Sequence, residues 1–113
     1  MRTERVYPRH RVTVPLYITM GGEYFQKTIP LESKDVSGGG ISFETTKQVP
    51  LEAESSVIVA GLGDLGKAAF IQGRVVHRSR NPSSDGYTVG LQFTGFVNTT
   101  REELLARIEA WKE

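Results

Sequence analysis

The sequence predicts an all-β protein, a six-stranded antiparallel β-barrel that carries one C-terminal α-helix. Six segments show the alternation of apolar and polar residues, or the compact apolar run, that is typical of strands. Turn-forming residues separate these segments at regular intervals, and only the end of the chain has helical spacing. We expect a barrel rather than an open sheet because closure removes exposed strand edges.

The strands follow from the positions of apolar residues and of turn signals. The first has an apolar residue at every second position, and Gly21-Gly22 then marks a turn. The sixth has the most regular alternation in the chain and follows a polar loop at residues 81–86. The predicted strands are residues 12–20, about 24–36, 41–44, 56–60, 68–78 and 87–93, and the predicted helix covers about residues 99–112.

The second strand contains a break in its alternation. Leu31 and Val36 lie an odd number of positions apart, so a regular strand would point them to opposite faces. If both face the core, the strand must bulge near Ser33-Lys34. Asp35 and Ser37 then point outward.

The helix is predicted from its first turn and from one apolar face. Thr99 precedes Glu102 by three positions, which is the spacing of a capping box. Leu104, Ile108 and Trp111 recur at helical spacing. We expect this face to cover the barrel.

Composition indicates one soluble globular domain. The chain has 113 residues, 38% of them apolar and 24% charged, and no apolar run approaches the roughly 20 residues that a spanning helix needs. The N-terminus is polar and basic, unlike a secretory signal. The chain has no cysteine, which excludes thiolate nucleophiles and thiolate metal sites. We expect a cytoplasmic protein.

Charge is concentrated at the N-terminal end. The net charge is only +1, which argues against a protein that mainly coats nucleic acid or anionic membrane. Residues 1–11, however, carry four arginines against one glutamate. We therefore predict two regions, a flexible basic arm at residues 1–11 and the barrel with its helix at residues 12–113.

The segment Gly61–Ala68 matches G-x-G-x-x-G and most of the P-loop pattern. A P-loop needs a hydroxyl for magnesium at the position of Ala68, and a helix should follow to receive the phosphates. The next residues have strand chemistry instead. We interpret this segment as a turn between two strands.

The sequence also argues against catalysis and against a metal cofactor. His10 and His77 are the only histidines, and neither has carboxylates at ligand spacing. His77 shares its parity with Val75 and is interpreted as a barrel side chain. Ser37 lacks the strand-turn-helix elbow that presents a nucleophilic serine. We predict a non-enzymatic protein without cofactor or metal.

Two arginines of the arm are suited to an anion. Arg5 and Arg9 are separated by three residues, and Pro8 keeps the segment from being a regular helix. When the segment is extended, both can face one ligand. A guanidinium binds phosphate with two parallel hydrogen bonds and can also reach the N7 and O6 acceptors of guanine.

The segment Asp35–Gly40 offers the opposite chemistry. The carboxylate of Asp35 can accept hydrogen bonds from guanine N1–H and N2, and Ser37 can add a hydroxyl contact. Three consecutive glycines let a purine or a phosphate approach the backbone closely. Together with the arm, these residues suit an anionic guanine nucleotide better than bare phosphate or a neutral ligand.

The two motifs together resemble those of PilZ domains, a family of bacterial receptors for cyclic di-GMP. Arg5-x-x-x-Arg9 is similar to the R-x-x-x-R motif of the family, and Asp35-x-Ser37-x-x-Gly40 to its [DN]-x-S-x-x-G motif. Residues 73–76 and 89–93 are similar to the fifth and sixth strands of the family. The family fold is a six-stranded antiparallel barrel with a C-terminal helix, as the patterns predict.

The resemblance implies a role for each motif residue. Arg5 and Arg9 would clamp phosphates and guanine Hoogsteen edges, Asp35 and Ser37 would read guanine, and Gly40 would keep the shape of the loop. The resulting hypothesis is a non-enzymatic receptor for cyclic di-GMP in which the arm closes over the ligand and signals to a downstream protein partner, whose identity is unknown. No specific nucleic acid is expected.

Two alternatives keep the barrel. One is an adaptor that binds a protein partner without nucleotide, with the arginines facing acidic side chains. The other is a small-barrel binder of RNA or single-stranded DNA, for which Tyr7, Tyr17 and Tyr24 would stack on bases. The net charge of +1 counts against the latter.

Overall fold

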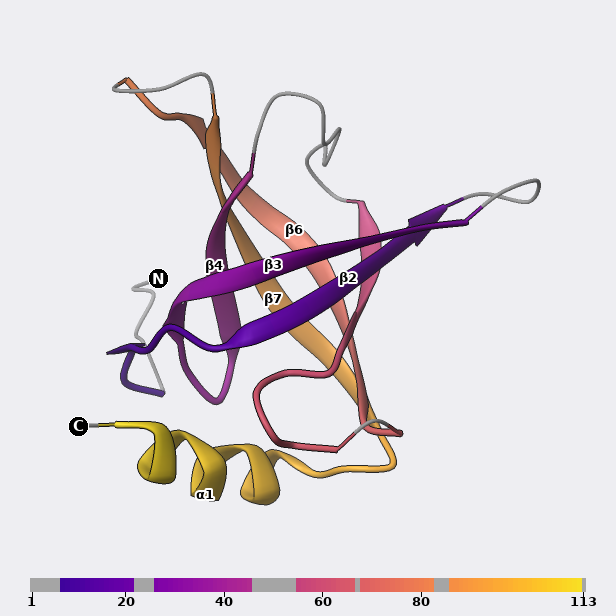
Figure 1. Cartoon of the computed structure of the whole chain (residues 1–113), viewed down its shortest axis with the longest axis vertical. Helices are drawn as coiled ribbons and strands as arrows, with labels where there is room; N and C mark the ends of the chain where they lie inside the picture. Colours follow the sequence, from indigo (N-terminus) through magenta and orange to yellow (C-terminus); the bar gives the residue numbers. More distant parts are fainter. Residues whose placement is uncertain (1–6, 22–25, 46–54, 67, 83–85, 113) are drawn as a thin grey trace, which may run out of the picture.

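A computed structural model describes residues 7–21, 26–45, 55–66, 68–82 and 86–112. This part of the chain contains seven strands and one helix (Figure 1). They are β1 (His10–Arg11), β2 (Pro15–Gly21), β3 (Gln26–Val36), β4 (Gly40–Thr45), β5 (Ser56–Ala60), β6 (Phe70–Arg80), β7 (Tyr87–Val97) and α1 (Arg101–Trp111).

Six of the strands form a closed antiparallel barrel. The strand order is β3-β2-β5-β6-β7-β4, and β3 also pairs with β4, which closes the ring. The predicted six-stranded barrel with one C-terminal helix is therefore confirmed. The two-residue β1 is additional and pairs with the end of β3, His10 opposite Val36 and Arg11 opposite Asp35. Residues 10 and 11, predicted as the end of the arm, are thus part of the sheet.

Alternate side chains of the strands fill the barrel, as the sequence patterns predicted. Buried residues alternate with exposed ones from Val12 to Ile18, although β2 itself begins only at Pro15. Before β2 the chain is held by Ser33, whose hydroxyl accepts a hydrogen bond from Val14 N at 3.0 Å and donates one to Val12 O. These bonds explain why a polar side chain is buried at this position.

The predicted bulge in the second strand is confirmed. The register between β3 and β4 shifts between Ser33 and Asp35. Val36 consequently lies in the core with no exposed surface, and Asp35 keeps part of its side chain exposed. Two further shifts, which the sequence did not indicate, fall in the pairing of β6 with β7, between Gln72 and Gly73 and between Val75 and His77. Val75 is buried but His77 is exposed, so the two side chains do not share a face.

The N-cap of the helix lies one residue after the predicted cap. Thr100 rather than Thr99 is the N-cap, and its side chain accepts a hydrogen bond from Glu103 N at 3.1 Å. Thr99 is buried instead. Leu104 and Ile108 are buried, so the predicted apolar face is confirmed, and α1 lies across one end of the barrel (Figure 1). No helix in the described part of the chain is long and apolar enough to cross a membrane.

The glycine-rich loop between β5 and β6 supports the far end of this helix. Asp64 accepts hydrogen bonds from Trp111 Nε1 at 2.9 Å and from Arg107 Nε at 3.0 Å. Gly63 has a φ of +58°, and a Cβ at this position would lie 2.3 Å from the Trp111 ring. The loop leads into a strand and not a helix, so the interpretation as a turn holds and the P-loop mechanism does not apply.

Gly63→Ala should destabilise the protein more than Gly61→Ala. Both glycines have φ near +60°, so a side chain costs each about 1–2 kcal/mol of backbone strain. The new Cβ at position 61 would meet the exposed Tyr17 ring at 3.0 Å, and Tyr17 can move away. At position 63 it would meet Trp111, adding about 1–3 kcal/mol of overpacking. Urea unfolding followed by Trp111 fluorescence tests this order, and equal losses would contradict it.

Asp64→Asn should lower stability in a pH-dependent way. The hydrogen bonds from Arg107 and Trp111 hold the pKa of Asp64 below its ordinary value of 3.8. The carboxylate therefore stabilises the fold above pH 3.8, and this contribution is lost as the pH falls through the lowered pKa of the folded state. The difference in melting temperature between wild type and Asp64→Asn should stay constant above about pH 5 and shrink between about pH 5 and pH 2. A difference that stays constant over this range would exclude the carboxylate as its source.

Candidate functional site

The turn between β3 and β4 is held together by Ser37. Its Oγ accepts hydrogen bonds from Gly39 N and Gly40 N, each at 3.1 Å, and Ser37 N donates to Gly40 O at 2.9 Å. Ser37 is 9% exposed. The expectation that this side chain points outward is therefore wrong, because the hydroxyl satisfies the backbone N–H groups of its own turn.

Gly40 brings the turn against strand β7. A Cβ at this position would lie 2.2 Å from the carbonyl oxygen of Leu91. The neighbouring Gly39 O accepts a hydrogen bond from Phe93 N at 2.9 Å. Only a residue without a side chain permits this approach, which gives a physical reason for glycine at the last position of the motif.

The other two glycines lie beneath the ring of Tyr7. A Cβ on Gly38 would be 2.9 Å from the Tyr7 ring and 2.9 Å from the Leu105 side chain, and a Cβ on Gly39 would be 3.2 Å from Tyr7. The arm is thus packed on the turn at Tyr7, two residues before Arg9. This contact places the second arginine of the first motif beside the second motif.

Asp35 lies at the other side of the turn, on β3. Ser42 Oγ donates a hydrogen bond to its Oδ2 at 3.2 Å, and Arg11 Nε is 4.0 Å from its Oδ1. The Arg11 side chain is 80% exposed, so this ion pair is weak. The carboxylate keeps hydrogen-bonding capacity for a ligand, since each of its oxygens can accept two bonds.

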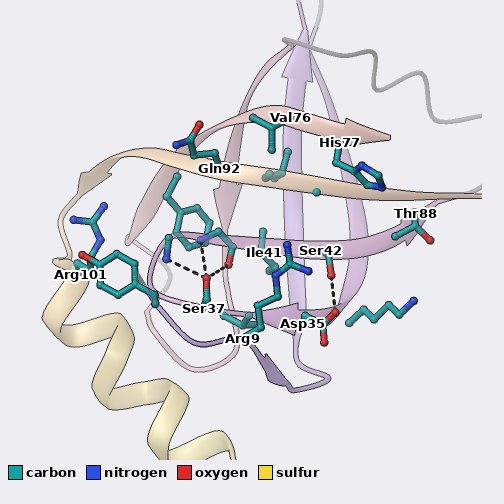
Figure 2. Close-up of a pocket in the computed structure, with 18 residues that line it drawn as sticks. Arg9, Asp35, Ser37, Ile41, Ser42, Val76, His77, Thr88, Gln92 and Arg101 are labelled. Atoms are coloured by element: carbon teal, nitrogen blue, oxygen red, sulfur yellow. Dashed lines mark hydrogen bonds between the residues drawn. The ribbon is translucent and has the colours of Figure 1, made fainter. Parts of the chain in front are cut away.

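Arg9, Asp35, Ser37 and Gly40 line one pocket of about 1040 Å³ (Figure 2). The Arg9 side chain is exposed and forms no ion pair with the residues that the structure describes. Arg5 lies outside the described residues. Four of the five predicted site residues are thus brought together, from the arm, from β3, from the turn after it and from the start of β4.

A family model described as the PilZ domain matches residues 3–110. The chain belongs to the PilZ domain family. No curated protein matches the sequence.

Several solved structures share the PilZ fold of this chain at low sequence identity. The inhibitor of motility MotI/DgrA of Bacillus subtilis has a TM-score of 0.72 and 17% identity, over 96% of this chain and 51% of its own. K. pneumonia MrkH in complex with c-di-GMP has a TM-score of 0.68 and 16% identity, over 96% and 52%. The PilZ domain of Escherichia coli YcgR with c-di-GMP has a TM-score of 0.61 and 15% identity, over 96% and 92%. This PilZ chain spans about half the length of the first two.

The remaining walls of the pocket were not predicted from the sequence. His77 reaches the pocket because of the bulge after Val75 in β6. Gln92 comes from β7 and accepts a hydrogen bond from Arg74 Nη2 at 3.1 Å. Arg74 and Arg78 do not line the pocket. The lining residues that sequence reasoning missed include Val76, His77, Thr88, Gln92 and Arg101.

Arg101 contributes a second arginine to the pocket from the first position of α1. Its Nε donates a hydrogen bond to Gly38 O at 2.9 Å. Its guanidinium carbon lies 5.3 Å from the centre of the Tyr7 ring and 5.0 Å from that of Phe96. A helix-starting arginine gives no signal of this role in the sequence, because its contacts with Gly38 and Tyr7 join residues more than sixty positions apart.

The donor set of the pocket suits an organic anion better than a metal ion. In the described ranges, no group of three or more histidine and acidic side chains is arranged to hold a metal. The pocket combines guanidinium groups, a partly exposed carboxylate and backbone at the glycine turn. This combination can bind phosphate oxygens and the hydrogen-bond donors of a base in the same ligand.

Gly40→Ala should be strongly destabilising, whereas Gly90→Ala serves as its control. The added Cβ at position 40 would overlap the Leu91 carbonyl, which is backbone and cannot move without opening the pairing of β4 with β7. At position 90 it would meet only His77 Cβ, at 3.3 Å. We expect a loss on the order of 3 kcal/mol for Gly40→Ala and below about 1 kcal/mol for Gly90→Ala in urea unfolding. Comparable losses of stability in the two variants would show that overlap with the Leu91 carbonyl is not the cause of the destabilisation.

Proposed function

We propose that this PilZ domain is a receptor for cyclic di-GMP. The observation that carries the proposal is the convergence of Arg9, from the arm, with Asp35 and the Ser37–Gly40 turn on one pocket of about 1040 Å³. Guanidinium matches the anionic phosphates, and the carboxylate matches the N1–H and N2 donors of guanine. Two PilZ-fold proteins with a similar structure, MrkH and YcgR, were solved with c-di-GMP, which supports the same ligand here.

We propose the following roles for the motif residues. Arg9 binds a phosphate or a guanine Hoogsteen edge, and Arg5 joins it from the arm. Asp35, held by Ser42, reads the Watson–Crick edge of one guanine. Ser37 contributes by shaping the turn, since its hydroxyl is already bonded to Gly39 N and Gly40 N. Gly40 allows the turn to form the floor of the site.

We propose that the receptor binds its ligand without converting it chemically. Of the two serines that line the pocket among the described residues, Ser37 is bonded within its turn and Ser42 donates to Asp35, and neither stands at a strand-turn-helix elbow. The output is then a change of conformation, in which the arm closes over bound ligand and a downstream protein partner in the cytoplasm recognises the closed form. Recovery of unchanged cyclic di-GMP after incubation with the protein tests the first part of this proposal.

The positions of the tyrosines argue against the alternative that this protein binds RNA or single-stranded DNA. Tyr7 is packed between the glycine turn and Arg101, and Tyr17 projects from β2 and does not line the pocket. Tyr24 lies outside the described residues. A stacking groove needs its aromatic rings along one path, and the two described rings do not share one.

Arg9→Ala and Asp35→Ala should each weaken binding of cyclic di-GMP by about ten- to a hundredfold, because each removes a charge-assisted hydrogen bond worth roughly 1.5–3 kcal/mol. Arg78→Ala is the matched control. Its guanidinium lies 4.1 Å from the Tyr87 ring and outside the pocket, so its affinity should stay at the wild-type value. Isothermal titration calorimetry measures all four proteins.

Two results would count against the proposal. Wild-type protein that binds no cyclic di-GMP at micromolar concentrations would favour the adaptor alternative. Wild-type affinity in both Arg9→Ala and Asp35→Ala would place the ligand elsewhere on the barrel.

A further inference from the structure

Arg101 is held in place more firmly than Arg9 of the arm. Arg9 is exposed and has no ion pair with the described residues, whereas Arg101 is partly buried and has three contacts. Its Nε is hydrogen-bonded to Gly38 O, and its guanidinium lies near the rings of Tyr7 and Phe96. An arginine fixed in this way loses little side-chain entropy when it binds a ligand.

The contacts of Arg101 leave part of its guanidinium available. The Nε atom donates to Gly38 O, and the guanidinium lies near two aromatic rings. The two Nη amino groups have no hydrogen-bond partner among the described residues. These two groups can still donate hydrogen bonds to a ligand in the pocket that Arg101 lines. Arg101 therefore has the properties of a preorganised binding group rather than of a side chain fully occupied by structural contacts.

Arg101 and Asp35 lie at opposite sides of the pocket, with Arg9 between them (Figure 2). The proposed ligand has two guanines. A guanine presents donors on its Watson–Crick edge, which suit Asp35, and the N7 and O6 acceptors on its Hoogsteen edge, which suit an arginine. Two different protein groups at two sides of one pocket can thus read the two bases by different edges.

We propose that Arg101 is a further ligand-binding residue, which reads the N7/O6 edge of the second guanine, and that Tyr7 positions it. This inference rests on the proposed function, because it needs cyclic di-GMP in the pocket. It also assigns a role to Tyr7, which lies between the two arginines of the first motif. Tyr7 covers Gly38 and Gly39 and supports the guanidinium of Arg101.

The experiment compares cyclic di-GMP with 3′,3′-cyclic GMP-AMP, in which one guanine is replaced by adenine. Adenine keeps N7 but has an amino donor in place of O6, so it cannot accept both hydrogen bonds from an arginine. Wild-type protein should therefore bind cyclic di-GMP about ten- to a hundredfold more tightly than the hybrid. Arg101→Gln should weaken binding of cyclic di-GMP by a similar factor and should affect the hybrid much less, so the selectivity falls toward one.

The conservative variants separate binding from folding. Arg101→Lys keeps the charge and most of the aliphatic stem but loses the planar fork, so it should stay folded and still lose selectivity. Tyr7→Phe keeps the ring and should behave as wild type, whereas Tyr7→Ala should lose affinity.

Arg107→Gln is the matched control from the same helix. Arg107 is paired with Asp64 away from the pocket, so this variant should change the melting temperature and leave both affinities unchanged.

Each outcome bears on one proposal. Wild-type selectivity in both Arg101→Gln and Arg101→Lys, measured well below their melting temperatures, would show that Arg101 has only a structural role and would overturn the inference while leaving the receptor function intact. Wild-type protein that binds neither dinucleotide would overturn the proposed function itself and this inference with it.

Discussion

The close approach of the Ser37–Gly40 turn to strand β7 is the contact on which both the barrel and the pocket depend. Gly40 lies so near Leu91 O that a side chain would overlap it, and Gly39 O is bonded to Phe93 N. The turn joins β3 to β4, and the pairing of these strands closes the ring. The same backbone contact therefore completes the sheet and forms one wall of the candidate site, so the site cannot be displaced without opening the barrel.

The C-terminal helix shares this dependence because it is fixed at both ends by contacts with glycine-containing loops. At its start, Arg101 is bonded to the carbonyl of Gly38. At its end, Trp111 packs where a side chain on Gly63 would be and donates to Asp64. Leu104 and Ile108 bury the face between these two ends. The position of the helix is consequently set by the barrel, and its first residue belongs to the wall of the pocket.

The sequence predicted the features that local periodicity determines. It missed those in which two adjacent residues of the same type could each take one structural role. The parity of Leu31 and Val36 required a bulge in β3, and the structure has it. No such conflict was visible in β6, because Val75 and Val76 are both apolar and either can face the core; only the register with β7 turns His77 toward the pocket. The helix cap was ambiguous for the same reason. Two adjacent threonines precede two adjacent glutamates, and burial of Thr99 selected the second pair.

The three glycines illustrate why the motif was recognisable while its physical basis was not. In the sequence, a run of glycine indicates conformational freedom. In the structure these three glycines have ordinary negative or extended φ values, and each position is crowded: Gly38 by Tyr7 and Leu105, Gly39 by Tyr7, and Gly40 by β7. These neighbours come from the arm, the helix and the last strand, far away in sequence. The run is therefore required by close packing of the backbone and not by flexibility, and the same packing brings Arg9 and Arg101 to one pocket.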